Sequence, residues 1–232
     1  DFIVVDGKEG GTGAAPLEFA NHMGMPLVEG LTFAHNTLRG VGLREQIRIG
    51  ASGKLIHSFD IARALALGAD WANSARGFMF AIGCIQSQKC HTDHCPVGVA
   101  TQNPELRSRF TGKPEFVVTF FEFIAQEVRE ILAELGFRTL EEMVGRVDRL
   151  EARQAVDHWK ARGIDLSTLL YSPEVDPDWG RYCQDEQDHG LERSLDVTQL
   201  LDLCRPAIER GEEVVANLEV RNVHRVVGTI VG

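Results

Sequence analysis

The chain has 232 residues, of which 44% are hydrophobic, so it is long enough to bury a substantial core. Its formal net charge of -10 excludes nucleic-acid binding driven by a surplus of Lys and Arg. The sequence has no apolar run of about 18 residues and no signal-like leader, so we expect a cytoplasmic protein with no membrane span and no nucleic-acid partner.

The first part of the chain alternates short apolar runs with helical patterns, an order typical of βα units around a parallel sheet. Phe2–Val5 is an apolar, mostly β-branched run that predicts a buried strand. Ser58 is expected to cap a helix that ends at Gly68. The elements expected up to residue 83 are strands at 2–5, 47–49 and 69–75, a glycine-rich loop at 6–13, and helices at 31–43 and 59–67. This pattern predicts an α/β fold.

The rest of the chain predicts helices separated by longer irregular segments. Pro114 suits the first turn of a long helix and Gly136 its end. Thr139, followed three residues later by Glu142, resembles a capping box for a short helix that ends at Val144. The elements expected after residue 83 are an irregular cysteine-rich loop at 84–100, helices at 114–135 and 195–209, a polar connecting segment at 150–190, and an extended stretch at 214–231.

Both ends of the chain carry strand-like sequence, Phe2–Val5 at the start and Val226–Gly232 at the end. A domain that began or ended inside a strand would leave an unpaired strand edge. We therefore expect this chain to be a piece of a longer protein.

Three cysteines gather in one short loop with the spacing C-x5-C-x4-C. They are Cys84, Cys90 and Cys95, and Pro96 follows the last of them. Thiolates at such short separations suit a single metal centre, and iron-sulfur clusters are often held by cysteines in loops of this kind. A structural zinc site completed by His91 or His94 is a second reading, and three unligated thiols are a third. The five cysteines of the chain do not suggest a secreted disulfide framework.

Two turns of small residues follow the second and third expected strands. Ser52, Gly53 and Lys54 offer a hydroxyl, a flexible backbone and a cation, while Ala75, Arg76 and Gly77 offer a guanidinium group that matches phosphate geometry. Barrels of the (β/α)8 type often bind phosphate with the loops after their last strands. Small residues also occupy such loops for conformational reasons alone. The two turns in consecutive units, followed by a metal loop, favour a phosphate site.

A third candidate feature is the glycine-rich loop after the first strand. It contains Gly10, Gly11, Thr12 and Gly13. Glycines allow a ligand to approach the backbone closely, although a tight turn with positive φ would use them equally well.

Several His and aromatic residues are expected to be structural. Histidines are commonly packed or exposed without catalysing anything, and aromatic side chains at helical spacing usually belong to a core. The residues concerned are His22, His35 and His57, the three tryptophans Trp71, Trp159 and Trp179, and Phe116, Phe120, Phe121 and Phe123.

Together these features resemble the glutamate synthase family. Gly7–Pro16 resembles the family's glycine-rich turn, G-x-x-G-G-T-G-A-x-P, and Gly83–Gln102 resembles its cluster loop almost position for position. Residues 121–140 and 145–148 are similar to the helix and turn that close the synthase domain, and Arg221–Thr229 resembles the opening of the family's C-terminal right-handed β-helix. The resemblance covers most of the chain.

The resemblance implies the later part of an FMN-dependent (β/α)8 barrel at residues 1–150, a mostly helical connecting segment at 151–210, and the start of a β-helix domain at 211–232. In this family glutamine-derived ammonia adds to 2-oxoglutarate, and reduced FMN delivers a hydride to give L-glutamate. Cys84, Cys90 and Cys95 would then hold a three-iron four-sulfur cluster. The cluster would receive electrons from ferredoxin or from an NAD(P)H-dependent small subunit.

The resemblance also implies a place for the flavin. Residues 10–12, 52–54 and 75–77 would lie near FMN, while the residues that hold the substrate would precede Asp1. Two turns depart from the family pattern, because Ser52–Lys54 stands where the large subunit has D-G-G and Asn73–Arg76 stands where it has G-x-G-[ST]. These departures resemble the stand-alone glutamate-synthase-like flavoproteins. A flavoprotein that reduces another imine or carbonyl on the same scaffold is therefore one alternative, and a zinc-stabilised non-catalytic module is another.

Overall fold

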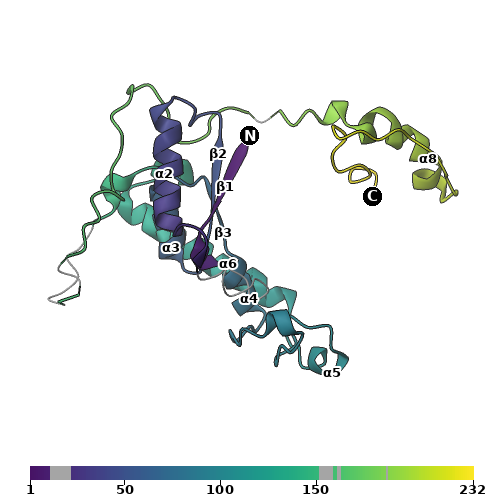
Figure 1. Ribbon diagram of the computed structural model, residues 1–232, viewed down its shortest axis with the longest axis horizontal. Helices are drawn as coiled ribbons and strands as arrows, with labels where there is room; N and C mark the ends of the chain where they lie inside the picture. The colour runs from purple at the N-terminus through teal and green to yellow at the C-terminus, as the bar shows by residue number, and fades with distance from the viewer. Residues whose placement is uncertain (11–21, 152–158, 161–162, 187) are drawn as a thin grey trace. The chain divides into compact units, whose positions relative to one another are not determined.

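The computed structural model describes residues 1–10, 22–151, 159–160, 163–186 and 188–232 (Figure 1). The chain forms two compact units, Asp1–Asp185 and Glu186–Gly232. The domain boundaries expected at residues 150 and 210 stay predictions. No helix in the described ranges is both long enough and apolar enough to cross a bilayer.

The first unit is built on a sheet of three parallel strands in the order β1-β2-β3, which confirms the α/β class. The strands are β1 (Phe2–Asp6), β2 (Arg48–Ser52) and β3 (Trp71–Asn73). Asp6 pairs with Ser52, and Ser52 pairs with Asn73, so the carboxyl ends of all three strands lie at one edge. The turns after the strands therefore meet at that edge. Closure of the sheet into a barrel stays an implication of the resemblance.

Strand β1 is largely exposed, although its apolar sequence predicted a buried strand. The exposed fractions are 67% for Phe2, 41% for Ile3 and 42% for Val4. Among the described residues the strand pairs with β2 alone, and Val5 is its residue packed against the core. An apolar run therefore predicted the strand correctly, but it could not show how many neighbours the strand has.

Helix α2 (Leu27–Gly40) lies alongside β1 and β2 (Figure 1). It begins four residues before the expected start at residue 31 and ends three residues before residue 43. Its first N–H group, on Leu27, donates to both carboxylate oxygens of Glu9, at 3.0 and 3.1 Å. A carboxylate at this end also complements the helix dipole. Glu9 lies 18 residues upstream, so no local sequence signal marks this cap.

Helix α3 (Ser58–Ala66) is capped by His57 rather than by Ser58. The Asp60 carboxylate accepts the His57 N–H at 3.1 Å, which is the reciprocal half of a capping box. The helix ends at Ala66, one residue before the expected end at 67, and Gly68 follows the C-cap with a φ of 114°. A Cβ on Gly68 would lie only 2.2 Å from the His35 ring, so glycine is required there for space as well as for conformation.

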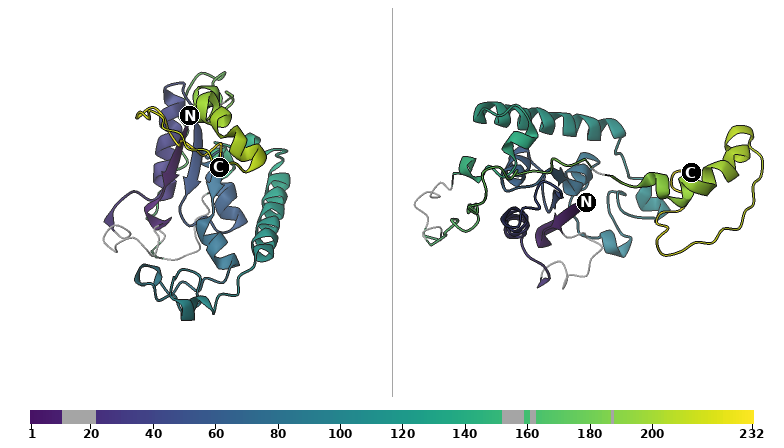
Figure 2. Two further views of the ribbon diagram at one scale, coloured as in Figure 1. Left: turned by 90° about the vertical axis from the view of Figure 1, so that its right-hand side faces the viewer. Right: turned by 90° about the horizontal axis from the view of Figure 1, so that it is seen from above.

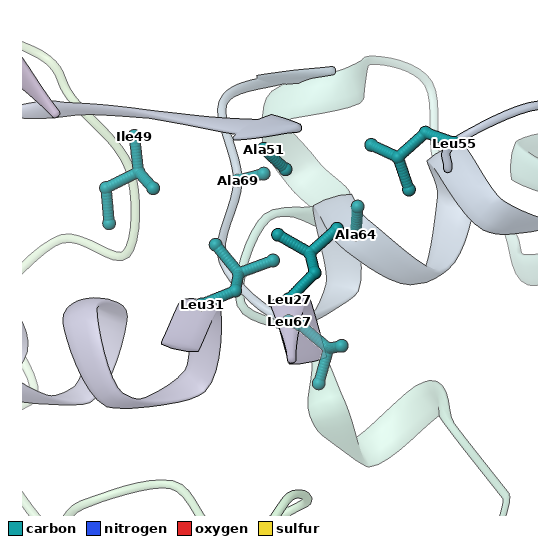
Figure 3. Packing of buried hydrophobic residues seen from close by; sticks show 8 residues of the cluster. All are labelled: Leu27, Leu31, Ile49, Ala51, Leu55, Ala64, Leu67 and Ala69. Carbon is teal, nitrogen blue, oxygen red and sulfur yellow. The ribbon is translucent and has the colours of Figure 1, made fainter. Parts of the chain in front are cut away.

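A first core cluster fills the space between the sheet, α2 and α3 (Figure 3). A fully buried Leu or Ile side chain contributes about 1.5–3 kcal/mol relative to an exposed one. The cluster therefore fixes the layer that carries the strand ends. Its buried members are Leu27, Leu31, Ile49, Ala51, Leu55, Ala64, Leu67 and Ala69.

Helix α6 (Pro114–Leu135) has the predicted bounds and ends at Gly136, which is left-handed. It packs against α3 and against the short helix α4 (Ala75–Ala81) (Figure 2). Its buried residues, Ile124, Val128 and Leu132, recur every four positions. They belong to a second cluster whose other buried members are Ala62, Leu65, Ala66, Met143 and Val144.

The expectation that the aromatic residues form core is wrong for several of them. Phe123 on α6 is 66% exposed and Phe116 is 49% exposed, because only one stripe of the helix meets α3. Phe120 does pack against the second cluster. Trp159 is 72% exposed and Trp179 is 39% exposed. Aromatic content alone did not distinguish the buried face of the helix from the exposed one.

The first unit also contains several short helical turns. Thr139 caps α7 as predicted, because its Oγ1 accepts the Glu142 N–H at 3.3 Å. These short elements are η1 (Lys8–Gly10), η2 (Cys90–Thr92), α5 (Pro104–Arg107), α7 (Leu140–Met143) and η3 (Val147–Arg149).

A buried polar network joins the amino ends of β2 and β3. The Arg44 side chain is 1% exposed, and its guanidinium group donates to the Asp70 carboxylate at 2.8 Å, to the Ile47 carbonyl at 2.8 Å and to the Gly68 carbonyl at 2.9 Å. Its Nε donates to His35 Nδ1 at 3.2 Å. Burial, followed by the nearby arginine charges, lowers the pKa of His35 to about 3. His35 is thus a neutral, packed residue, as expected from the sequence.

The second unit is described on its own. The helix expected at 195–209 is present as a π-helical turn η5 (Asp196–Leu200) followed by α8 (Leu201–Arg210), and a 3-10 turn η4 (Leu191–Arg193) precedes them. The 214–231 stretch contains no strand among the residues described in this unit, and residues 227–231 form turns instead. The Asp196 carboxylate accepts the N–H groups of Gly228 and Ile230, both at 2.8 Å. The start of a β-helix stays an implication of the resemblance, because its strands would need neighbouring coils for pairing.

Candidate functional site

The turns after β1 and β2 pack directly on each other at the carboxyl edge of the sheet. The Gly7 N–H donates to the Ser52 carbonyl at 2.8 Å. A Cβ on Gly10 would lie 2.9 Å from Gly53 Cα, closer than such atoms approach in proteins. Packing of one turn against the other thus accounts for glycine at position 10. Gly11 and Thr12, which were also expected near the cofactor, lie outside the described residues.

The turn after β2 has an unusual backbone. Gly53 has a φ of 142° and Lys54 a φ of 51°, so both adopt conformations that favour glycine. The Lys54 side chain is exposed, whereas Gly53 is buried and Ser52 is half-buried. This arrangement directs the chain sharply away from the strand and leaves the Lys54 cation at the surface of the strand-end edge.

The turn after β3 is joined to the turn after β2. Ser74 Oγ donates to the Leu55 carbonyl at 2.5 Å, and Ala75 begins α4. A Cβ on Gly77 would lie 2.4 Å from Ser74 Oγ, so a larger residue there would break this link. Arg76 is half-buried between Ala75 and Gly77. The structure thus brings the two predicted phosphate turns together at one edge.

The cysteine loop leaves this edge through α4. Helix α4 ends at Ala81, and the Cys84 N–H donates to the Met79 carbonyl at 2.9 Å, so Cys84 follows the helix directly. Cys90 opens the 3-10 turn η2. Cys84 and Cys90 are half-buried, Cys95 is buried, and all five cysteines are free thiols. The loop therefore presents three thiols without disulfide bonds within twelve residues.

Cys95 lies in an environment that stabilises a thiolate. Its side chain is 5% exposed. Burial raises the pKa of the Cys95 thiol, but hydrogen bonds from the backbone N–H groups of Ala100, Val97, Val99 and Gly98 outweigh burial, and the resulting pKa is below the ordinary value. Backbone N–H groups directed at a cysteine sulfur are also one of the features that tune iron-sulfur clusters.

A carboxylate that the sequence reasoning did not single out closes this loop. Asp93 lies between Cys90 and Cys95 and accepts hydrogen bonds from Thr101 Oγ1 at 2.8 Å and from the Gln102 N–H at 2.6 Å. These bonds lower the pKa of the Asp93 carboxyl, with the Gln102 N–H as the largest cause. Such a link between positions eight or nine residues apart in an irregular loop has no periodic signal in the sequence.

Within the described ranges, no group of three or more His, Cys, Asp or Glu side chains is arranged to hold a metal ion. The structure therefore does not bring Cys84, Cys90 and Cys95 together as one metal-binding group. Their assignment as ligands rests on donor chemistry, since three free thiols and a sulfur surrounded by N–H groups suit an iron-sulfur centre. His94 Nδ1 lies 2.5 Å from the Thr92 carbonyl, which leaves its Nε2 for the alternative zinc site.

A cavity among the described residues lies away from these turns and from the cysteine loop. Its volume is about 270 Å³, and it is lined by Arg39 and by residues from Pro177 to Gln184. None of the predicted site residues lines this cavity. The candidate site is thus defined by the strand-end turns and the cysteine loop rather than by an enclosed pocket.

Comparison with known proteins supports the family that the sequence resembles. A family model described as a conserved region in glutamate synthase matches residues 1–138. The large chain of the NADPH glutamate synthase of Bacillus subtilis (strain 168) is 46% identical over 233 residues, which cover 100% of this chain. The NADH glutamate synthase of Schizosaccharomyces pombe is 40% identical over 98% of this chain, and the chloroplastic ferredoxin-dependent enzyme of Oryza sativa subsp. japonica is 41% identical over 100% of it.

The aligned region is a small part of each relative. It covers 15% of the Bacillus subtilis protein, 11% of the Schizosaccharomyces pombe protein and 14% of the Oryza sativa protein. The family match extends over residues 1–138, which include the strand-end turns and the cysteine loop and make up more than half of the chain. This chain therefore belongs to the glutamate synthase family.

Proposed function

We propose that this chain is part of a glutamate synthase that forms L-glutamate from 2-oxoglutarate and glutamine-derived ammonia, with FMN and an iron-sulfur cluster as cofactors. It would contribute the later part of a (β/α)8 barrel, the cluster loop and the start of a β-helix domain. The observation that carries the proposal is the position of the three-thiol loop, which follows directly from two joined turns at the carboxyl edge of a parallel sheet. That edge is where barrel enzymes of this class place their chemistry.

The two joined turns suit the phosphate group of FMN. Lys54 is exposed at the edge, and Arg76 lies in the first turn of α4, where backbone N–H groups lack helical acceptors. A cation and a guanidinium group near such N–H groups favour a bound dianion. Bound FMN would supply two-electron hydride chemistry, and the cluster would supply single electrons. The residues proposed near FMN are Gly10, Gly11, Thr12, Ser52, Gly53, Lys54, Ala75, Arg76 and Gly77.

Helix α4 links the proposed phosphate turn to the thiol loop. Ala75 begins the helix, Ala81 ends it, and the Met79 carbonyl fixes the backbone of Cys84. With a rise of 1.5 Å per residue, the helix separates the two features by roughly 10 Å. Packing against α6 holds α4 in place. We infer that this short rigid connection keeps the flavin and the cluster at a constant separation.

The electron donor is proposed to bind outside this segment. Relatives named for NADPH, NADH and ferredoxin are 46%, 40% and 41% identical to this chain. These values are similar, so the segment fits a role that all three enzyme types share. The partner that delivers electrons would be ferredoxin or an NAD(P)H-dependent small subunit.

Transfer of an isotope label tests the proposed reaction. The full-length protein receives 2-oxoglutarate, amide-15N glutamine and either reduced ferredoxin or NADPH or NADH together with an NAD(P)H-dependent small subunit. With at least one of these donors it should place 15N in the amino group of newly formed glutamate. Mass spectrometry of the glutamate measures the transfer, and a reaction without 2-oxoglutarate is the control. If flavin-dependent reduction of a different imine or carbonyl proceeds while no label reaches glutamate, the stand-alone type of activity replaces this proposal.

Retention of FMN tests the phosphate assignment. Lys54→Gln and Arg76→Gln in the full-length protein should each weaken FMN binding on the order of tenfold, because each removes a charged partner of the phosphate. Fluorescence of the released flavin measures the FMN content at increasing dilution. Lys113→Gln is the matched control, since Lys113 is also exposed but lies at the start of α6. Unchanged FMN content in both test variants would refute the assignment of the two turns.

A further inference from the structure

The segment between the second and third loop cysteines has little regular backbone structure to hold it. Cys90 lies in a three-residue 3-10 turn, and Asp93 follows in a left-handed conformation with a φ of 60°. Side-chain bonds supply what regular structure does not. Asp93 Oδ1 accepts a hydrogen bond from Thr101 Oγ1 at 2.8 Å and another from the Gln102 N–H at 2.6 Å. These bonds tie the turn after Cys90 to the chain beyond Cys95.

Thr101 extends this link towards the next helix. Its side chain is largely buried, with 9% exposed, and its hydroxyl lies 2.6 Å from the Asp93 carbonyl. The same Oγ1 accepts the Asn103 N–H at 3.1 Å. Asn103 then caps α5, because its Oδ1 accepts the N–H groups of Glu105 at 3.0 Å and Leu106 at 3.3 Å. A continuous set of hydrogen bonds thus runs from the turn after Cys90 to the start of a helix.

The link from Asp93 to Thr101 encloses the part of the loop that surrounds the Cys95 sulfur. Residues 97–100, the backbone that directly follows Cys95 and Pro96, all lie between the two linked positions. Gly98 within this stretch has a φ of 78°, and a Cβ there would lie 2.4 Å from the Leu106 carbonyl. The enclosed stretch is therefore packed closely onto α5. Loss of the link would free both the Cys90 turn and the backbone that follows Cys95.

We propose that Asp93 and Thr101 are positioning residues of the cluster loop, which hold Cys90 and Cys95 in place for an iron-sulfur cluster. This inference rests on the proposed function, in which these cysteines are cluster ligands. Residues that hydrogen-bond to metal ligands and orient them typically lower metal affinity 10- to 100-fold when they are replaced. The competing explanation is conformational, since Asp tolerates left-handed backbone and could occupy position 93 for that reason alone.

Four variants of the full-length protein separate the two explanations. Asp93→Gly keeps the left-handed backbone but removes the carboxylate, while Asp93→Asn keeps both the conformation and an oxygen acceptor. Thr101→Val removes the hydroxyl group while the shape of the side chain stays nearly constant. Thr101→Ser keeps the hydroxyl group. The measurements are iron and acid-labile sulfide per chain, the rate of cluster loss to a chelator, and the electron paramagnetic resonance spectrum of the cluster.

We expect Asp93→Gly and Thr101→Val to lose the cluster at least about tenfold faster than the unchanged protein. Asp93→Asn and Thr101→Ser should stay close to the unchanged protein, and FMN content should be the same in all four. Equal cluster lifetimes in Asp93→Gly and the unchanged protein would overturn the proposal in favour of the conformational explanation. Loss of FMN together with the cluster would overturn it too, because the fold would then have failed. If the unchanged protein holds no iron, the proposed function itself is wrong, which is a separate result.

Discussion

Replacing Cys95 with Ser in the full-length protein should abolish stable binding of iron and acid-labile sulfide. The buried sulfur is surrounded by the N–H groups of residues 97–100, and a serine hydroxyl is a poor ligand for iron in such a cluster. Protein prepared without oxygen should contain less than about a tenth of the iron of the unchanged protein. Iron and sulfide analysis measures this effect directly, and flavin content reports whether the fold survives.

Cys204→Ser is the matched control for this experiment. Cys204 is also a free thiol, half-buried where Cys95 is buried, and it lies on α8 in the second unit. Its replacement should leave iron and sulfide unchanged. Zinc in the unchanged protein, with no sulfide, would instead support the structural zinc site that His91 or His94 could complete. Absence of any metal from anaerobically prepared protein would exclude both assignments.

The second large effect is expected at Arg44. Arg44→Met should lower the local stability of β2 and β3 by about 3–5 kcal/mol, because it leaves the Asp70 carboxylate without its charged partner. The carbonyl groups of Ile47 and Gly68 lose hydrogen-bond donors as well. Hydrogen exchange followed by mass spectrometry should show faster exchange in peptides that contain these strands. A local measurement suits a protein of several domains, for which a single unfolding free energy is not defined.

Arg48→Met is the control for this change. Arg48 lies only four residues away and is exposed at the start of β2, so its replacement should alter stability by less than about 0.5 kcal/mol. Asp70→Asn combined with Arg44→Met should recover part of the protection against hydrogen exchange, since it removes the unpaired carboxylate charge of Asp70. Equal exchange rates in Arg44→Met and Arg48→Met would show that the buried network does not hold the strands together.

Local signals predicted a large share of the fold. Pro114 and Gly136 marked the ends of α6 correctly because proline suits a first helical turn and glycine tolerates the left-handed end. The order of three strands and the helices between them followed from apolar periodicity, and the structure confirms a parallel sheet. The two small-residue turns were predicted to follow consecutive strands, and the structure brings them together at one edge.

Long-range contacts were the part that local patterns could not supply. The start of α2 depends on Glu9, which lies 18 residues upstream, and the exposure of β1 depends on how many strands flank it. Aromatic residues on α6 were misassigned because the number of layers covering a helix is not encoded in its own spacing. The link between Asp93 and Thr101 could not be predicted because both residues lie in irregular backbone, which has no helical or strand periodicity in the sequence.

The shortness of α4 has a consequence for how this protein can change over evolutionary time. A single residue inserted between Ala75 and Ala81 would turn everything after it by roughly 100° about the helix axis and advance it by about 1.5 Å. The sulfur atoms beyond Cys84 would then face a different direction from the one set by the strand-end turns. A change in the length of this seven-residue spacer is therefore expected to disturb the cysteine loop more than a change in an irregular surface connection would.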